Sequence, residues 1–266
     1  QRPERRLELA QQLVVAAART GSVEAELDAL RLVVTAHMEL ADRLGAAAAA
    51  QHYGQRAEQA GSVLHQWWAA LRAEALASCG GRLPVAARHA ARAAALQAGV
   101  DPETVRLATD ERRLSDAIRD GQLAELATAL EALEDDVSSF DPLYQIAGAA
   151  ISTAVGVEPS EDYLRSLWET VRGTFRAAPG AALVVLALGG STPSDALADD
   201  LGAELAALSG CWIPVGGSAG VGPADAYLAR LCRRRGEVGA AAHHREVATS
   251  VAHRFAPAWA RFTEME

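Results

Sequence analysis

Residues 80–99, with the sequence GGRLPVAARHAARAAALQAG, decide the fold class of this chain. Two glycines and Arg82 precede Leu83, and an alanine-rich run then continues to Gly99. Alanine has the highest helix propensity, and proline is tolerated near the first helical position because that residue needs no backbone donor. The stretch therefore predicts a turn followed by an α-helix from Pro84 to Gln97.

The same order of glycine, polar residue, aliphatic residue and helix recurs along the chain. In tetratricopeptide repeats (TPRs), whose period is about 34 residues, such a glycine closes the turn between two helices. The copies here are 60, 40 and 115 residues apart, so we expect a degenerate array. They are Gly21-Ser22-Val23, Gly81-Arg82-Leu83, Gly121-Gln122-Leu123 and Gly236-Glu237-Val238. The prediction is an all-α, degenerate TPR-like helical-hairpin solenoid, in which each hairpin buries its faces by stacking on its neighbours.

Composition supports this fold class. Half of the 266 residues are hydrophobic, but only 5% are aromatic, and no long run alternates in the manner of a strand. Even the short apolar run from Ala181 to Leu188 is predicted as a buried helix. We expect one domain over residues 1–266, with a sub-division into 1–140 and 141–266. Because the chain starts at Gln1 without a methionine, we expect a fragment of a larger protein.

The charged residues exclude several functions. The chain has no lysine, which excludes a P-loop lysine and a Schiff-base lysine. A net charge of −9 repels phosphate backbones, so direct nucleic-acid binding is not expected. The local basic runs, Arg5-Arg6, Arg112-Arg113 and Arg233-Arg234-Arg235, are interpreted as solvated faces or as cations at helix ends.

Cysteine usage and hydropathy bear on the compartment. Cys79, Cys211 and Cys232 are widely spaced and odd in number, which favours reduced thiols. The longest apolar run, Ala181 to Leu188, is too short to span a bilayer. We therefore expect a cytoplasmic protein that does not bind membranes.

The chain contains one motif of nucleophilic catalysis. Residues 216–220, GGSAG, match G-x-S-x-G, which in α/β-hydrolases holds a serine on a turn above a parallel sheet. Chain order would allow Ser218 and Asp225 to act with a later histidine, at position 243, 244 or 253. However, Pro214 interrupts the preceding run and no strand–helix alternation lies upstream. We predict a connecting loop, assign no catalytic residue, and keep a serine hydrolase using Ser218 as a remote alternative.

Metal and cofactor sites are not predicted either. Adjacent His243 and His244 would point about 100° apart on a helix, and no His-Glu-x-x-His pattern occurs. The acidic cluster Glu131, Glu134, Asp135 and Asp136 is interpreted as a solvated helix end. We therefore expect no metal and no cofactor.

Aromatic side chains are the more informative candidates. Tyr53, His65, Trp67 and Trp68 lie in an alanine-dominated region. Such groups either fill gaps in the packing of the hairpins or line a concave groove. Adjacent tryptophans cannot both face the same core, so these four are the candidates for contact with a ligand or partner.

The C-terminal third resembles the C-terminal TPR-like region of large actinobacterial regulators that carry an ATPase core of the AAA or STAND type. The matching residues are Val215-Gly216-Gly217, then Gly236, Ala241, His244 and Ala248, and the ending FAPAWAR at 255–261. Ser218 departs from the usual third glycine of this loop. In those regulators the output domain is a LuxR-type helix-turn-helix, a SARP/BTAD-type activator or a nucleotide cyclase.

The resemblance implies a non-enzymatic sensor or protein-interaction module of a transcriptional regulator. Its groove would bind a small-molecule effector or a protein, and its partners would be the ATPase and output domains of the same polypeptide. A purely structural scaffold that dimerises is the alternative, so a homo-oligomer stays open. The resemblance transfers no binding residue.

Overall fold

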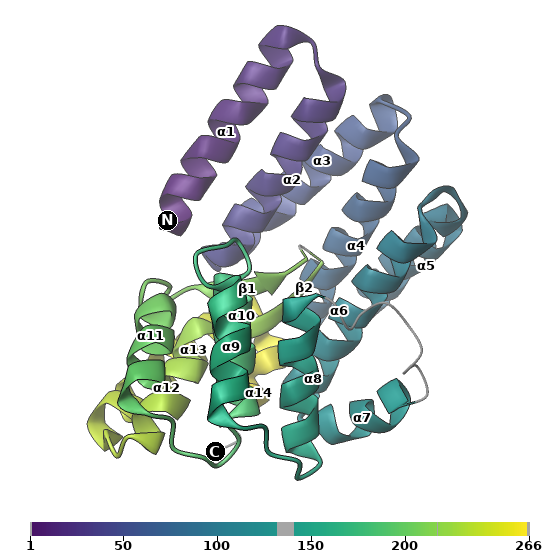
Figure 1. Ribbon diagram of the computed structural model, residues 1–266. Coiled ribbons are helices and arrows are strands. Elements are labelled where there is room, and N and C mark those ends of the chain that lie inside the picture. The colour runs from purple at the N-terminus through teal and green to yellow at the C-terminus, as the bar shows by residue number, and fades with distance from the viewer. Residues whose placement is uncertain (1, 132–140, 217, 265–266) are drawn as a thin grey trace. The chain divides into compact units, whose positions relative to one another are not determined.

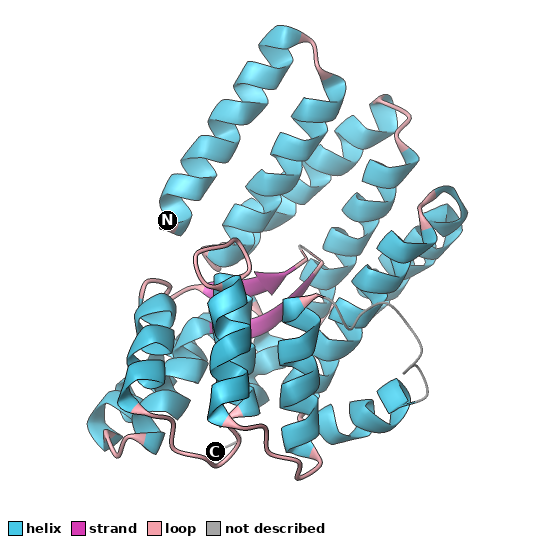
Figure 2. Cartoon of the chain, in the orientation of Figure 1, coloured by secondary structure: helices cyan, strands magenta, loops and turns pink. Residues whose placement is uncertain are grey.

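The structure, a computed structural model, describes residues 2–131, 141–216 and 218–264. The described residues are mostly helical, with one two-stranded sheet, which confirms the all-α fold class (Figure 2). The chain forms two compact units. Unit 1 contains residues 1–112, 214–220 and 251–260, and unit 2 contains residues 113–213, 221–250 and 261–266. Glu134, Asp135 and Asp136, like the sub-division predicted at 140, fall outside the described residues.

Unit 1 begins with five long helices, each packed on the next along the chain (Figure 1). A short 3₁₀ helix and then α6 follow, and residue 112 within α6 is the last of this segment in unit 1. The elements are α1 (Pro3–Thr20), α2 (Val23–Glu39), α3 (Arg43–Gln59), α4 (Val63–Cys79), α5 (Leu83–Leu96), η1 (Gln97–Gly99) and α6 (Pro102–Asp120). Helix η3 (Pro257–Trp259), from the C-terminal part of the chain, packs on α4.

The turns between these helices follow one local chemistry. Gly21 and Gly61 adopt left-handed φ angles of 70° and 66°, which glycine reaches without a Cβ penalty. The next residue, Ser22 or Ser62, then caps the following helix by accepting a backbone N–H with its hydroxyl. Gly61-Ser62-Val63 is a further copy of the pattern that the sequence analysis missed.

The turns between the first five helices are more evenly spaced than the glycine copies predicted. Residues 21, 41, 61 and 81 all have positive φ and lie 20 residues apart, so each hairpin occupies 40 residues. Ala41, with φ 51°, occupies the position that glycine has in the other turns, and the sequence analysis missed this turn because it contains no glycine. The next residue, Asp42, caps α3. A repeat of 40 residues is longer than the about 34 residues of a TPR.

Unit 2 is organised around one apolar helix. α10 carries AAPGAALVVLA, which is buried on almost every side, and it packs on α8, α9, α11 and α12. A helix that is hydrophobic all round is stable only in such a core, and the prediction of a short buried helix at 181–188 is confirmed. The elements are α7 (Leu123–Glu131), α8 (Pro142–Ala154), α9 (Glu161–Val171), α10 (Ala177–Ala187), α11 (Asp195–Ala206), α12 (Ala224–Arg234), α13 (Val238–Phe255, which ends in unit 1) and α14 (Ala260–Glu264).

Of the residues that match G-x-S-x-G, Ala219 and Gly220 lie in a strand, which corrects the prediction of a connecting loop for them, whereas Gly216 and Ser218 lie in turns. β1 (Trp212–Val215) pairs with β2 (Ala219–Pro223), and the Ala224 amide donates to the Cys211 carbonyl oxygen at 3.1 Å. Pro214 is compatible with β1 because both strands of a two-stranded sheet are edge strands. The sheet consists of these two strands, and no further strand among the described residues pairs with them. It therefore lacks the parallel sheet on which a nucleophile elbow is built.

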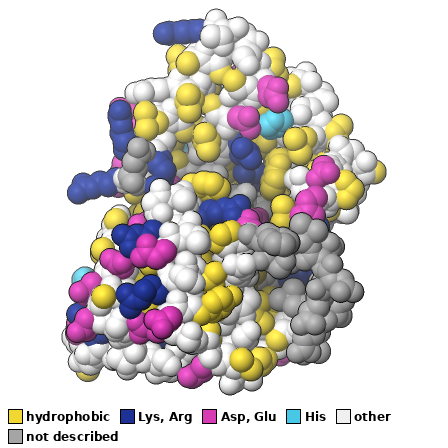
Figure 3. Space-filling view, in the orientation of Figure 1, with side chains coloured by type: hydrophobic (Ala, Val, Ile, Leu, Met, Phe, Trp, Pro, Cys, Tyr) yellow, Lys and Arg dark blue, Asp and Glu magenta, His cyan; other side chains and the backbone are white. Residues whose placement is uncertain are grey.

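The basic runs are paired with carboxylates and carbonyls. Arg6 lies 2.7 Å from Glu39, and Arg235 lies 2.6 Å from Asp199. Arg234 donates to the carbonyl oxygens of Val185 and Gly189, which are acceptors at the end of α10. Figure 3 shows arginine and carboxylate side chains interspersed on the surface, as expected for solvated faces. No helix in the described ranges is both long and apolar enough to cross a membrane.

Candidate functional site

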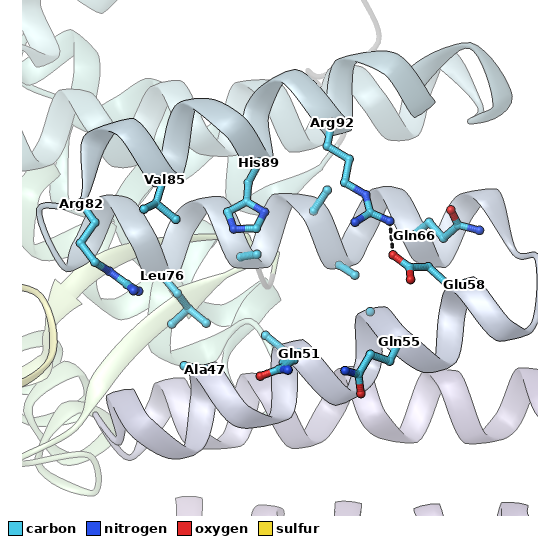
Figure 4. A pocket seen from close by; sticks show the side chains of 15 residues that line it. Ala47, Gln51, Gln55, Glu58, Gln66, Leu76, Arg82, Val85, His89 and Arg92 are labelled. Carbon is cyan, nitrogen blue, oxygen red and sulfur yellow. Dashed lines mark hydrogen bonds and ion pairs between the residues drawn. The ribbon is translucent and has the colours of Figure 1, made fainter.

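A groove in unit 1 lies between α3, α4 and α5 and has a volume of about 420 Å³ (Figure 4). Its floor exists because the residues of α3 and α4 that face it have short side chains. A larger residue at any of these positions would fill the space between the two flanking helices. The floor residues are Ala50, Gly54, Ala69, Ala70 and Ala73.

One wall of the groove is basic. Val85, His89 and Arg92 of α5, together with Arg82 at its N-cap, follow one another at a spacing of three or four residues, which places them on one side of the helix. α5 contains no Asp or Glu, although the whole chain carries a net charge of −9. Neither Arg82 nor His89 forms an ion pair with any described residue. This wall is therefore a local concentration of positive charge.

The opposite wall is formed by amides and one carboxylate. Gln51 and Gln55 project from α3, and Gln66 from the first part of α4. Glu58 reaches across from the end of α3 to pair with Arg92, as the dashed line in Figure 4 shows. Both members of that pair are about half exposed, so the ion pair is solvent-screened and contributes little to stability.

The pKa of His89 is affected by the positive charges around the groove. Burial lowers the pKa of His89, and the neighbouring Arg88, Arg92 and Arg82 lower the pKa further. All three of these charges repel the protonated imidazole, so His89 is neutral near pH 7 and offers one donor and one acceptor. The groove thus combines side chains that hydrogen-bond amides with two guanidinium groups that attract anions.

The predicted site residues Tyr53, His65, Trp67 and Trp68 lie elsewhere in unit 1. None of the four lines the groove. Tyr53, His65 and Trp67 are buried and Trp68 is half-buried. Trp67 packs with Ala70, Ala93, Val100 and Ala108 in a core cluster, against which Trp68 lies, so the expectation that adjacent tryptophans cannot face the same core is wrong. A role of these aromatics in contact with a ligand stays a prediction.

Tyr53 and His65 form a buried polar pair. The Tyr53 hydroxyl lies 2.8 Å from His65 Nδ1, with the two rings perpendicular. Burial raises the pKa of Tyr53 to about 12, so the phenol keeps its proton and donates to the imidazole. Burial also lowers the pKa of His65, so the imidazole is the neutral acceptor.

Arg72 completes this cluster and was missed by the sequence analysis. Its side chain is buried, its Cζ lies 5.2 Å from the Trp68 ring centroid and 5.9 Å from that of Tyr53, and Nη1 donates to the Trp68 carbonyl oxygen at 3.3 Å. Burial lowers the pKa of Arg72 to about 10, which leaves it charged at pH 7. Aromatic faces stabilise such a desolvated cation. A single arginine in a helix carries no sequence signal of this burial.

The residues of the remote hydrolase alternative are not joined as a triad. Ser218 Oγ is buried and has no hydrogen-bond partner among the described residues. The pair that does form is Asp225 and His244 in unit 2, with 2.8 Å between Oδ1 and Nδ1. Asp225 also accepts from the Ser209 hydroxyl at 2.9 Å and from the Gly210 amide at 2.6 Å. These bonds link three segments around a fully buried carboxylate, which is a structural role.

No cluster of three or more His, Cys, Asp or Glu side chains in the described part of the chain is arranged to hold a metal ion. Comparisons with protein-family models, with curated proteins and with solved structures find no match to this chain. The resemblance to actinobacterial regulators therefore stays a prediction, and the α3–α5 groove is the candidate site on its geometry alone.

Proposed function

We propose that this chain is a non-enzymatic interaction module that binds a segment of a partner protein in the α3–α5 groove. The groove carries the proposal, because its alanine floor leaves room for a ligand between a basic wall and an amide wall. Glutamine amides both donate and accept, which suits the alternating N–H and C=O groups of a peptide backbone. The resemblance of residues 215–261 supports a place for the module in a multidomain transcriptional regulator. Binding would then shift the equilibrium of attached domains by its differential affinity for their two states.

The volume of the groove also favours a second candidate, a small-molecule effector. Ligand pockets range from about 300 to 1,000 Å³, and the groove is about 420 Å³. Both candidates place the ligand on the same floor, so one variant tests both.

The test fills the groove from its floor. Ala73→Phe places an aromatic ring where the ligand would lie, and Ala87→Phe, on an exposed part of α5 outside the groove, is the matched control. Peptides selected from a random library on the 266-residue chain should lose binding to Ala73→Phe and keep binding to Ala87→Phe. A thermal-shift screen of metabolites on the same proteins tests the effector. If the selected ligands bind both variants equally, the groove is not the site.

A further inference from the structure

We infer that the groove recognises an extended peptide segment with two acidic side chains four residues apart, and that Glu58 competes with this ligand for Arg92. The inference rests on the proposed function and names its ligand. It follows from the positions of the two arginines, from the amide wall between them and from the Glu58–Arg92 pair.

The arginines set the spacing. Arg82, at the N-cap of α5, and Arg92 within it are ten residues apart, which corresponds to about 15 Å along the helix backbone at a rise of 1.5 Å per residue. Figure 4 shows them at the two ends of the groove, with His89 between them. An extended chain advances about 3.3 Å per residue and its side chains alternate between two faces. Four residues is therefore the separation that comes near this distance with both acids on the same face. A ligand with two carboxylates at that separation can pair with both guanidinium groups at once.

The amide wall favours a peptide over a compact anion. Gln51 and Gln55 face α5 across the groove at a spacing of four residues, between the two arginines (Figure 4). They can hydrogen-bond the backbone of the residues that separate the two acids. Inorganic phosphate would reach one arginine at a time and leave these amides to water.

Glu58 acts as an internal competitor. In the free chain its carboxylate pairs with Arg92, so a ligand carboxylate must displace it. Because the pair is exposed, that displacement costs little. Loss of the Glu58 charge should therefore increase affinity for an acidic ligand, which a merely structural ion pair would not do.

The experiment measures fluorescence polarisation of labelled twelve-residue peptides with the 266-residue chain. The peptides have a Gly/Ser/Ala background and two glutamates that are two to nine positions apart, or a single glutamate. We expect the highest affinity at a separation of four, and lower affinity at a separation of three or five, which places the two glutamates on opposite faces. Arg82→Gln and Arg92→Gln should each weaken binding roughly three- to tenfold, and Glu58→Gln should strengthen it by about twofold or more.

Two variants outside the groove are the controls, and each changes the charge by the same amount as the test variants that it matches. Arg88→Gln removes a charge from the same helix, and Glu8→Gln removes an exposed carboxylate paired with Arg5. Both should leave affinity within twofold. Thermal unfolding of every variant confirms that the fold is retained.

The outcomes separate the two proposals. The inference is overturned if the affinity does not depend on the separation of the two glutamates, or if Arg88→Gln lowers it as much as Arg82→Gln or Arg92→Gln does. The attraction would then be unspecific. If acidic peptides do not bind, but neutral peptides selected from the library bind the unmodified chain and not Ala73→Phe, the proposed function stands and the inference of an acidic ligand is wrong. If no peptide of either kind depends on the groove, both are wrong.

Discussion

The Tyr53 hydroxyl lies 2.8 Å from His65 Nδ1 between α3 and α4, inside unit 1. The two side chains come from consecutive helices of one hairpin, so the hydrogen bond ties that hairpin together. The arrangement requires a neutral imidazole, because burial disfavours its protonated form.

Stability should fall as the solution is acidified, in part because of His65. The folded pKa of His65 is lowered below its ordinary value of 6.5, so the unfolded state binds the proton more tightly. The contribution of His65 is present above pH 6.5 and is lost as pH falls through 6.5 toward the folded pKa. Urea unfolding at pH 7.5 and 5.0 measures this loss.

His65→Gln removes the titrating group, so the difference in midpoint between the two pH values should shrink. His89→Gln tests the second histidine whose pKa is lowered, by burial and by Arg88, Arg92 and Arg82. An unchanged pH difference in His65→Gln would show that other groups carry it.

Gly81→Ala should destabilise the protein by about 1–2 kcal/mol, the cost of a left-handed φ for a residue with a Cβ. The φ of Gly81 is 69°, and an added Cβ would contact nothing within 4 Å, so the backbone alone is responsible. Gly148→Ala is the matched control, because Gly148 lies in α8 and its Cβ would also meet nothing within 4 Å. The control should gain about 0.5–1 kcal/mol from helix propensity. Chemical denaturation of both variants checks the opposite signs.

Asp225→Asn should cost about 2–4 kcal/mol, because the amide places a donor against groups that now donate to the carboxylate. Asp225 is fully buried and accepts from Ser209, Gly210 and His244. Asp200→Asn, which removes an exposed carboxylate 3.1 Å from Arg172, should cost about 0–1 kcal/mol. Equal losses in the two variants, measured by equilibrium unfolding, would contradict the structural role of Asp225.

Ser218→Ala should leave stability unchanged or raise it by about 1 kcal/mol, since the mutation removes a buried hydroxyl without a partner among the described residues. A catalytic serine would instead be revealed by covalent labelling with a fluorophosphonate that Ser218→Ala abolishes. Labelling of the unmodified chain at Ser218 would revive the hydrolase alternative.

Much of the local structure was predictable because its causes are local. Ser22 and Asp141 cap helices with their own side chains, and Gly81 closes a turn with its own φ. The 20-residue period was missed because the copy at Gly61 was overlooked and because Ala41 adopts a glycine-like conformation without being a glycine. The hairpin at 212–223 was missed because Pro214 argues against a strand, although an edge strand accepts it.

The sequence by itself determined that the chain is helical, that a helix follows the turn at Gly81, and that α10 is buried, because propensity, turn chemistry and an unbroken apolar run act within a few residues. Only the tertiary structure decided which helix faces meet. It placed Tyr53 and His65 in the interior, and opened a groove between Gln51 on α3 and His89 on α5. The physical reason is that burial depends on the packing of helices 20 residues apart, which the composition of any one helix does not specify.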